Sequence, residues 1–381
     1  MNIVKFSLPL GLAAIIGTAA PALAQLVESS AGPLRATILA EGLEYPWALA
    51  FLPEGRFLVS ERPGRLRIVE NGVVGGPIAG LPAVAARGQG GLLDVVLAAD
   101  FAESGRLFLS YAEPAADAGQ ARGAGTAVMA ARLVLDGDGG QLEDQEVIFR
   151  MNNFTTSNRH FGSRIVPGAD GNLFVTLGER GDMTRAQDPA DLAGGVVRIG
   201  IDGSVPEDNP RLDGWAPEFW SIGHRNPQGA TLRQSDGALF AVEHGARGGD
   251  ELNLVRAGAN YGWPVIAYGL DYSGAPIGEG REKAGLEQPL HYWDPSISPS
   301  GLDFYEGDLL PGWEGDLLLG GLSGTVLVRL DMEGDAVVGE ERLFEGQLGR
   351  VRDVRVGADG AIYLLTDAGN GRLIRVAPEG R

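Results

Sequence analysis

The stretch "ADGNLFVTLG" at residues 169–178 combines a tight-turn signal with a strand signal. Its Asp-Gly pair is typical of a hairpin turn, because glycine readily adopts the positive φ that such a turn requires. The β-forming residues that follow the turn predict a strand. Five further stretches repeat this order of turn residue, glycine and β-rich run: "PEGRFLVSER" (53–62), "ESGRLFLSYA" (103–112), "SDGALFAVEH" (235–244), "WEGDLLLGGL" (313–322) and "ADGAIYLLTD" (358–367).

Six copies of one antiparallel unit predict an all-β chain, folded as a six-bladed β-propeller with four-stranded antiparallel blades. A blade cannot bury both of its faces alone, so we expect the blades to stack around a channel. Residues 64–72, 325–334 and 371–380 are expected to be outer strands, each paired with the run before it. No linker divides residues 25–381, which favours one catalytic domain over the alternative of two β domains.

The amino-acid composition fits this fold and restricts the possible partners. The chain has 59 glycines and 22 prolines spread along its length, as expected for many turns between short strands. Its net charge of −19 predicts repulsion from nucleic acid and from anionic membrane surfaces. A neutral or cationic small molecule, or a metal ion, fits this charge better, and an anionic ligand would need a local cluster of arginines. The absence of cysteine excludes disulfide and thiolate chemistry.

The N-terminus has the features of a secretory signal peptide. Lys5 precedes an apolar run, and a small-residue pattern ends at Ala24, so residues 1–24 are expected to be removed by cleavage before Gln25. A buried N-terminal helix or an anchor is the alternative. No other stretch is apolar enough to span a membrane, so the mature protein is expected to be periplasmic or secreted.

Polar residues gather in loops directly before or after the repeated strands, and in a propeller such loops meet on one face, around the mouth of the channel. "RGQGGLLDV" (87–95) places Gln89 between glycines, which allow a backbone to approach a ligand closely. "GHRNPQG" (223–229) groups four polar side chains, namely His224, Arg225, Asn226 and Gln228. The alternatives are a plain glycine-rich turn for the first stretch and a solvated loop for the second.

The stretch "EHGARGGDELNLVRAGANYGWP" (243–264) combines carboxylates with carbonyls of a glycine-rich backbone. Asp250, Glu251 and the carbonyls of Gly245 and Ala246 are hard oxygen donors, which suit calcium better than zinc. The spacing differs from that of an EF-hand loop, so spacing alone leaves the presence of a metal open.

Two arginines and one histidine complete the set of candidates. Arg350 and Arg352 in "GRVRDVRV" (349–356) stand two residues apart, so on a strand both would point to the same face. Two guanidiniums on one face are typical of a clamp for a carboxylate or phosphate, with surface salt bridges as the alternative. His160 in "RHFGSR" (159–164), one of four histidines, is either a general base or a structural histidine.

At these residues the sequence resembles the soluble sugar dehydrogenases that depend on pyrroloquinoline quinone (PQQ), especially their aldose sugar dehydrogenase branch. The resemblance runs from "GLEYPWALAFLPEGRFLVSERPGRL" (42–66) to the C-terminus. Its most specific parts, in chain order, are "RHFGSR", "GHRNPQG", "DELNLVRAGANYGWP" and "GRVRDV". The resemblance implies a six-bladed propeller with PQQ in a polar site on one face and a calcium ion beneath the quinone.

The resemblance also implies a role for each candidate residue. His160 would be the catalytic base. The cofactor would be bound by Gln89, Arg225, Asn226, Tyr272, Arg350 and Arg352. Calcium would be bound by Glu251, Tyr261, Gly245 and Ala246, the last two through their carbonyls. A glucose-oxidising relative carries a lysine that contacts the cofactor where this chain has Ser323, so one cationic contact is absent here.

The activity implied by the resemblance is oxidation of an aldose sugar at its anomeric carbon to a lactone. His160 would take a proton from the anomeric hydroxyl, and a hydride would pass to a quinone polarised by calcium. An external electron acceptor would then reoxidise the cofactor. Two alternatives are a calcium-dependent lactonase or esterase, which needs no arginine clamp, and a non-catalytic sugar-binding propeller, which shows no turnover.

Overall fold

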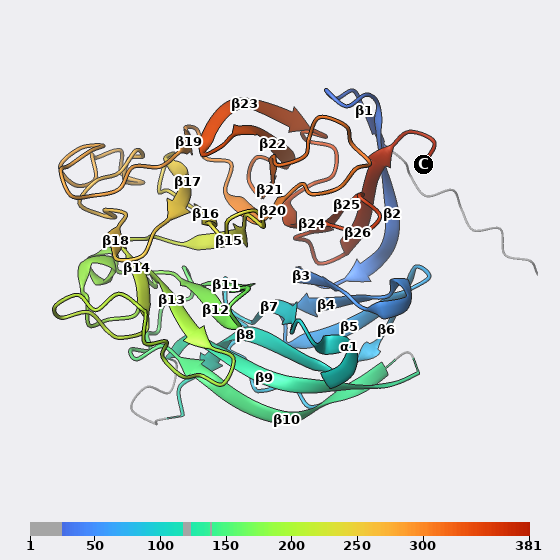
Figure 1. The fold of residues 1–381 in the computed structure, drawn as a ribbon, viewed down its shortest axis with the longest axis horizontal. Helices are drawn as coiled ribbons and strands as arrows, with labels where there is room; N and C mark the ends of the chain where they lie inside the picture. The colour runs from blue at the N-terminus through green and yellow to red at the C-terminus, as the bar shows by residue number, and fades with distance from the viewer. Residues whose placement is uncertain (1–24, 117–122, 138) are drawn as a thin grey trace, which may run out of the picture.

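The computed structural model describes residues 25–116, 123–137 and 139–381, which form six small antiparallel sheets arranged in a ring (Figure 1). The expectation of a six-bladed β-propeller with four-stranded antiparallel blades is confirmed. The expected signal peptide, residues 1–24, lies outside the described residues. Within the described ranges, no helix has the length and apolarity needed to cross a membrane.

The sheets are numbered here as blades in chain order, each given from its innermost strand outward. Blade 1 contains β3 (Pro46–Phe51), β4 (Phe57–Glu61), β5 (Arg65–Glu70) and β6 (Val73–Pro77). Blade 2 contains β7 (Leu92–Leu97), β8 (Arg106–Pro114), β9 (Ala124–Asp136) and β10 (Gly139–Arg150). Blade 3 contains β11 (Gly162–Pro167), β12 (Asn172–Leu177), β13 (Gly195–Gly200) and β14 (Phe219–Ile222), with β18 (Ala259–Asn260) parallel to β14.

The second half of the ring follows the same plan. Blade 4 contains β15 (Pro227–Leu232), β16 (Leu239–Glu243), β17 (Asp250–Val255) and β19 (His291–Trp293). Blade 5 contains β20 (Pro299–Phe304), β21 (Leu317–Gly321), β22 (Val326–Glu333) and β23 (Ala336–Leu343). Blade 6 contains β24 (Val351–Val356), β25 (Ile362–Thr366), β26 (Gly371–Pro378), β2 (Leu34–Leu43) and β1 (Gln25–Val27). The described helices are short: η1 (Pro53–Gly55), α1 (Phe101–Ser104) and η3 (Met183–Gln187).

The six repeated stretches of the sequence form the second strand of every blade, β4, β8, β12, β16, β21 and β25. The glycine in each turn before these strands has a φ between 68° and 87°, as the turn signal requires; these are Gly55, Gly105, Gly171, Gly237, Gly315 and Gly360. The expectation for residues 64–72, 325–334 and 371–380 is partly wrong. These residues pair with the runs before them, but they form third strands, because a further strand lies outside each of them. The sequence does not predict the fourth strand because most of its residues are exposed or only partly buried, as in β23, and carry little hydrophobic signal.

Blade 6 is built from both ends of the described chain. β2 pairs with the C-terminal strand β26 in antiparallel register, from Leu34 opposite Pro378 to Leu43 opposite Gly371. This pairing closes the ring, because it holds the last blade together with a strand that precedes blade 1 (Figure 1).

The core lies between the blades. Six clusters of buried apolar residues each join one blade to its neighbour, as Leu58 of blade 1 and Leu92 of blade 2 do. The innermost strands contact one another in a closed circle, β3 to β7, β11, β15, β20, β24 and back to β3. The loops before these innermost strands and after the second strands therefore gather at one mouth of the channel.

Candidate active site

A cavity of about 250 Å³ lies among the loops that precede the first strands and follow the second strands of the blades. Its lining is mainly polar and includes Arg62, Gln89, His160, Arg225, Gln228, His244, Tyr272, Ser296, Ser298, Arg350, Arg352 and Asp367. Five of the six expected cofactor-binding residues and the expected base thus meet in one place. The sixth, Asn226, is fully buried behind the cavity wall.

His160 is held by a buried carboxylate. Its Nδ1 lies 2.6 Å from Glu179 Oε2, and both side chains are more than 90% buried. A carboxylate at this nitrogen fixes the tautomer with hydrogen on Nδ1, so Nε2 is the nitrogen left to accept a proton. Burial lowers the pKa of His160 below its usual value, although the hydrogen bond with Glu179 opposes this effect. The ring is therefore neutral at pH 7, as a general base must be.

The backbone around His160 is packed more tightly than the polar, glycine-containing sequence suggests. His160 has a φ of 55°, a left-handed conformation that is unusual for a residue with a side chain. A Cβ atom on Gly178 would come within 2.2 Å of the His160 carbonyl oxygen, so only glycine fits there. Arg180 supports the same loop, since it donates to the carbonyls of Ser157 and Arg159 and stacks on Phe161.

The glycines around Gln89 serve protein packing. A Cβ atom on Gly88 would lie 2.4 Å from Asn158, one on Gly90 2.8 Å from Phe161, and one on Gly91 2.0 Å from the Arg62 carbonyl. These close contacts with neighbouring blades are enough to explain the three glycines, without the close approach of a ligand that the sequence suggests. Gln89 itself lines the cavity, and its Oε1 accepts a hydrogen bond of 2.7 Å from the His160 backbone N–H.

Three arginines converge on one carboxylate at the far side of the cavity. Arg350 and Arg352 both donate to Asp367 Oδ2, at 3.3 and 3.2 Å. Arg62 approaches the other oxygen, with 4.0 Å between Nη2 and Oδ1. Burial alone would raise the pKa of Asp367, but the charges of Arg352, Arg62 and Arg350 lower it. The carboxylate is therefore ionised and still leaves the cluster with a surplus of positive charge.

Arg225 adds a fourth guanidinium without a carboxylate partner. Its Nη1 donates to the backbone carbonyls of His244 and Gly245, while its buried Nε has no hydrogen-bond partner. Asn226 holds the Gly162 backbone N–H through Oδ1, at 3.1 Å, and its buried Nδ2 also lacks a partner. Free donors of this kind fit an anionic, oxygen-rich ligand.

The other two histidines near this site differ from His160. His224 is fully buried, bonded to Glu243 at 2.8 Å and to Ser221 at 2.9 Å, which makes it a structural residue. His244 lines the cavity, and its Nε2 donates to the Pro299 carbonyl at 2.7 Å. Burial and the charges of Arg225 and Arg352 lower the pKa of His244 to about 3, so this ring stays neutral.

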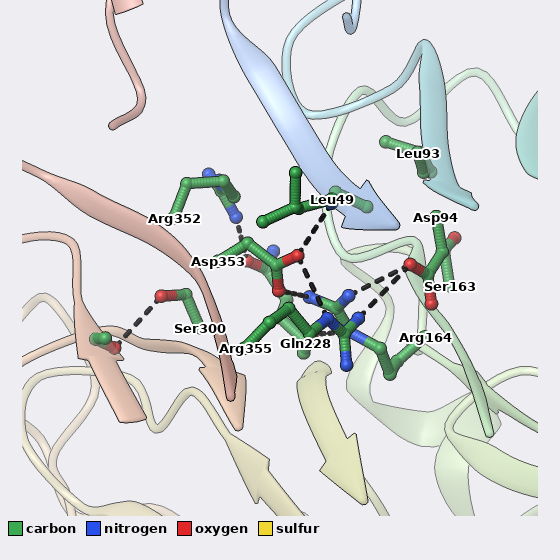
Figure 2. A network of polar contacts seen from close by, with 12 residues as sticks. Leu49, Leu93, Asp94, Ser163, Arg164, Gln228, Ser300, Arg352, Asp353 and Arg355 are labelled. Carbon is green, nitrogen blue, oxygen red and sulfur yellow. Dashed lines mark hydrogen bonds and ion pairs between the residues drawn. The ribbon is translucent and has the colours of Figure 1, made fainter. Parts of the chain in front are cut away.

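A buried ionic network joins three of the innermost strands, β7, β11 and β24 (Figure 2). Arg164 donates to Asp94 at 2.9 Å and lies 3.1 Å from Asp353, and all three side chains are essentially inaccessible to solvent. Gln228 connects this network to the cavity. Its backbone carbonyl accepts a hydrogen bond of 3.1 Å from Arg164 Nε, and its side-chain Oε1 accepts one of 2.7 Å from Arg352 Nη1. The network is therefore joined to Arg352 through Gln228.

The expected calcium ligands surround a second, smaller cavity of about 10 Å³, which is lined among others by Glu243, Gly245, Ala246, Glu251 and Tyr261. Glu243 and Glu251 lie opposite each other on β16 and β17, and Asn253 donates to both carboxylates, at 3.0 and 3.3 Å. Burial and the charge of Glu243 raise the pKa of Glu251 to about 8. Glu243 is also bonded by His224 and by the Arg225 backbone N–H, whereas Glu251 accepts a hydrogen bond, among the described residues, only from Asn253. A buried carboxylate with one donor, facing a second carboxylate, fits a site for a small divalent cation.

The other oxygen donors of this stretch are less free than the sequence suggests. The Tyr261 hydroxyl bonds to the Leu254 carbonyl and the Arg256 backbone N–H, so its own carbonyl is what remains for a metal. Asp250 accepts from the backbone N–H groups of Gly245, Ile297 and Ser298 and is thus structural. Among the described residues, no group of three or more His, Cys, Asp and Glu side chains is arranged to hold a metal.

Two further positions named in the sequence analysis border the cavity. Tyr272 lines it and is 67% exposed, so its ring is accessible to a ligand that enters from solvent. Ser323 bonds through its hydroxyl to Ser298 at 2.8 Å, beside the cavity wall. A short neutral side chain therefore stands where the resemblance implies a lysine in a glucose-oxidising relative.

Sequence reasoning missed Glu179, Arg62, His244 and Asp367. All four directly or closely follow the second strand of a blade, β12, β4, β16 and β25 respectively. Aligning the six repeats by these strands would have placed them on the same face as the residues that were found.

The chain is similar to known proteins in both sequence and structure. Residues 43–375 match the family model described as glucose/sorbosone dehydrogenase. The chain is 43% identical to the aldose sugar dehydrogenase YliI of Escherichia coli K12 over 347 residues, covering 90% of this chain and 92% of that protein.

Two solved structures extend the comparison. A crystal structure of a glucose dehydrogenase is 48% identical, with a TM-score of 0.85, over 89% of this chain and 98% of that one. The PQQ-bound aldose sugar dehydrogenase of Streptomyces coelicolor is 28% identical, with a TM-score of 0.76, over 94% of this chain and 99% of that one.

Proposed function

The chain belongs to the glucose/sorbosone dehydrogenase family, and from this premise we propose that it oxidises aldose sugars at the anomeric carbon to lactones with PQQ as cofactor. The observation that carries this proposal is the cavity itself. A neutral histidine oriented by a buried glutamate stands in one chamber with four arginines, in a chain whose net charge is −19. Residues 25–381 would act as one catalytic domain.

The cavity fits PQQ by its charge. PQQ has three carboxylates, and the cavity holds the guanidiniums of Arg62, Arg225, Arg350 and Arg352 against the single carboxylate of Asp367. Buried nitrogens without partners on Arg62, Arg225 and Arg352 are donors that such a ligand would satisfy. Gln89 and Tyr272 would add neutral contacts, and Asn226 would act from behind the cavity wall, where it holds the Gly162 backbone N–H. When bound, PQQ supplies an ortho-quinone that accepts a hydride from the sugar.

His160 is better suited than His244 to take the proton of the anomeric hydroxyl. Glu179 lies 2.6 Å from its Nδ1 and stabilises the imidazolium that forms when Nε2 accepts the proton. His244 has only a carbonyl at its Nε2 and a pKa of about 3, which makes it a weak base at neutral pH. The acid–base step therefore belongs to His160.

The proposal is tested by assaying the apo-protein on a panel of aldoses with a redox dye, with and without PQQ and calcium. We expect dye reduction only when PQQ is present. Lactone hydrolysis without PQQ would support the calcium-dependent lactonase or esterase instead. Sugar binding without turnover in the presence of PQQ would support a non-catalytic sugar-binding protein. An external electron acceptor would replace the dye in the cell.

The small cavity at Glu251 is proposed to bind calcium, held by the Glu251 carboxylate and the carbonyls of Tyr261, Gly245 and Ala246. The fit rests on hard oxygen donors and on the two facing carboxylates, whose repulsion a cation would relieve. Calcium at 100 times its Kd is expected to stabilise the native state by about 2.7 kcal/mol. The measurement is the thermal unfolding midpoint with calcium and after chelation.

Two variants make this calcium prediction specific. Glu251→Gln should unfold at the same temperature with and without chelator. Glu287→Gln, which removes only a surface carboxylate paired with Arg256 at 3.1 Å, should keep the parental response to calcium. A Glu251→Gln protein that still responds fully to chelation would rule out this site.

Export to the periplasm or secretion is proposed from the signal-like residues 1–24. We expect the mature protein in its native host to begin at Gln25, because the small-residue pattern ends at Ala24. Mass spectrometry of the purified protein measures this N-terminus directly. A mature protein that retains Met1 would contradict cleavage.

A further inference from the structure

Arg62 enters the large cavity from blade 1, directly after β4, and has no counterpart among the residues expected from the sequence. Its side chain is 20% exposed. Its Nη1 donates to the Gly88 carbonyl at 2.7 Å, and the guanidinium stacks over Tyr45 with its carbon 4.9 Å from the ring centre. The side chain is thus fixed in place, with its plane supported on one side by an aromatic ring.

The charge of Arg62 is not neutralised by the protein. Its nearest carboxylate oxygen, Asp367 Oδ1, lies at 4.0 Å and makes no hydrogen bond, while the other oxygen of Asp367 is taken by Arg350 and Arg352. The buried Arg62 Nε also has no partner. Three guanidiniums that share one carboxylate leave about two positive charges without a counter-charge from the protein. Their side chains range from 7% exposed for Arg352 to 49% exposed for Arg350, so Arg352 and Arg62 are the ones that solvent screens least.

We propose that Arg62 is a further cofactor-binding residue, whose guanidinium binds a carboxylate of PQQ together with Arg350 and Arg352. The inference rests on the proposed function. Arginine suits this role, since its planar fork of donors matches a carboxylate.

The test is equilibrium binding of PQQ to the apo-protein, followed by quenching of tryptophan fluorescence and independent of turnover. Arg62→Gln removes the charge but keeps an amide that can donate to the Gly88 carbonyl, and its Kd is expected to rise about 10- to 100-fold. Arg62→Lys keeps the charge and should lose less than about tenfold. Arg35→Gln, which removes a surface charge paired with Glu379, should bind PQQ like the parent.

Each outcome decides the inference. A parental Kd for Arg62→Gln would overturn it, and so would equal losses in Arg62→Gln and Arg62→Lys, because the residue would then act only by holding Gly88. If Arg62→Gln does not fold, a loss of more than about tenfold in folded Arg62→Lys overturns it. If the parent protein itself shows no saturable PQQ binding, the proposed function fails, which is a different result from failure of the Arg62 contact.

Discussion

His160→Asn is expected to bind PQQ but to lower turnover at saturating cofactor by about 10²- to 10⁴-fold, the usual contribution of a positioned general base. Asparagine is the suitable replacement because His160 has a φ of 55°, a conformation that asparagine tolerates better than most residues. Its amide can also donate to Glu179, so the buried carboxylate keeps a partner. The measurement is dye reduction by the PQQ-saturated variant with an aldose that the parent oxidises.

The pH dependence of kcat/KM is a second test of His160 as the general base. The base must be neutral, so kcat/KM should fall as the pH drops through the pKa of His160, which burial places below its usual value of 6.5. The acidic limb should therefore lie below pH 6.5. In Glu179→Gln the limb should move lower still, because the hydrogen bond and charge of Glu179 raise this pKa.

A matched control separates this effect from a general effect of losing a histidine. His291→Asn removes a histidine of β19 that pairs with Glu340 at 3.1 Å, outside the cavity, and should oxidise sugar at the parental rate. If His160→Asn also turns over at near the parental rate once saturated, then His160 is a structural residue and another group takes the proton.

Arg164→Met is expected to lower the free energy of unfolding by about 3–5 kcal/mol, the typical cost of removing one partner from a buried ionic network. Asp94 and Asp353 would stay fully buried, with Arg355 as the one remaining arginine paired with both carboxylates (Figure 2). The measurement is urea unfolding of the apo-protein at pH 7. The loss should shrink toward acidic pH, because burial already raises the pKa of Asp94 and the missing Arg164 charge would raise it further.

The control for this prediction is an arginine at the surface. Arg375→Met breaks a pair with Asp359 of 2.8 Å, in which both side chains are partly exposed, and should cost less than about 1 kcal/mol. A similar small loss in Arg164→Met would show that the buried ionic network adds little to stability. Any effect of Arg164→Met on PQQ affinity would act through Gln228, which joins Arg164 to Arg352.

The sequence by itself determined the fold class, the number of blades and the face that carries the site. These features depend on local signals: a turn whose glycine has a positive φ, preceded by Asp or Glu in five copies and by Ser in one, and then a strand, six times over. The polar motifs at Gln89, His160, Arg225 and Arg352 lie just before or at the start of the innermost strands β7, β11, β15 and β24, so their convergence follows once a ring of blades is assumed. Short-range chemistry is enough for such predictions, because each turn and strand is set by neighbouring residues.

Only the tertiary structure decided which residues act on one another. Glu179 meets His160 across 19 residues because β11 and β12 pair within blade 3. Arg62 of blade 1 approaches Asp367 of blade 6 because the first and last blades become neighbours when the ring closes. The closing strand itself, β2, is joined to β26 over more than 300 residues. Burial depends on all of these contacts at once, and burial is what keeps His160 neutral and leaves the arginine cluster short of a counter-charge.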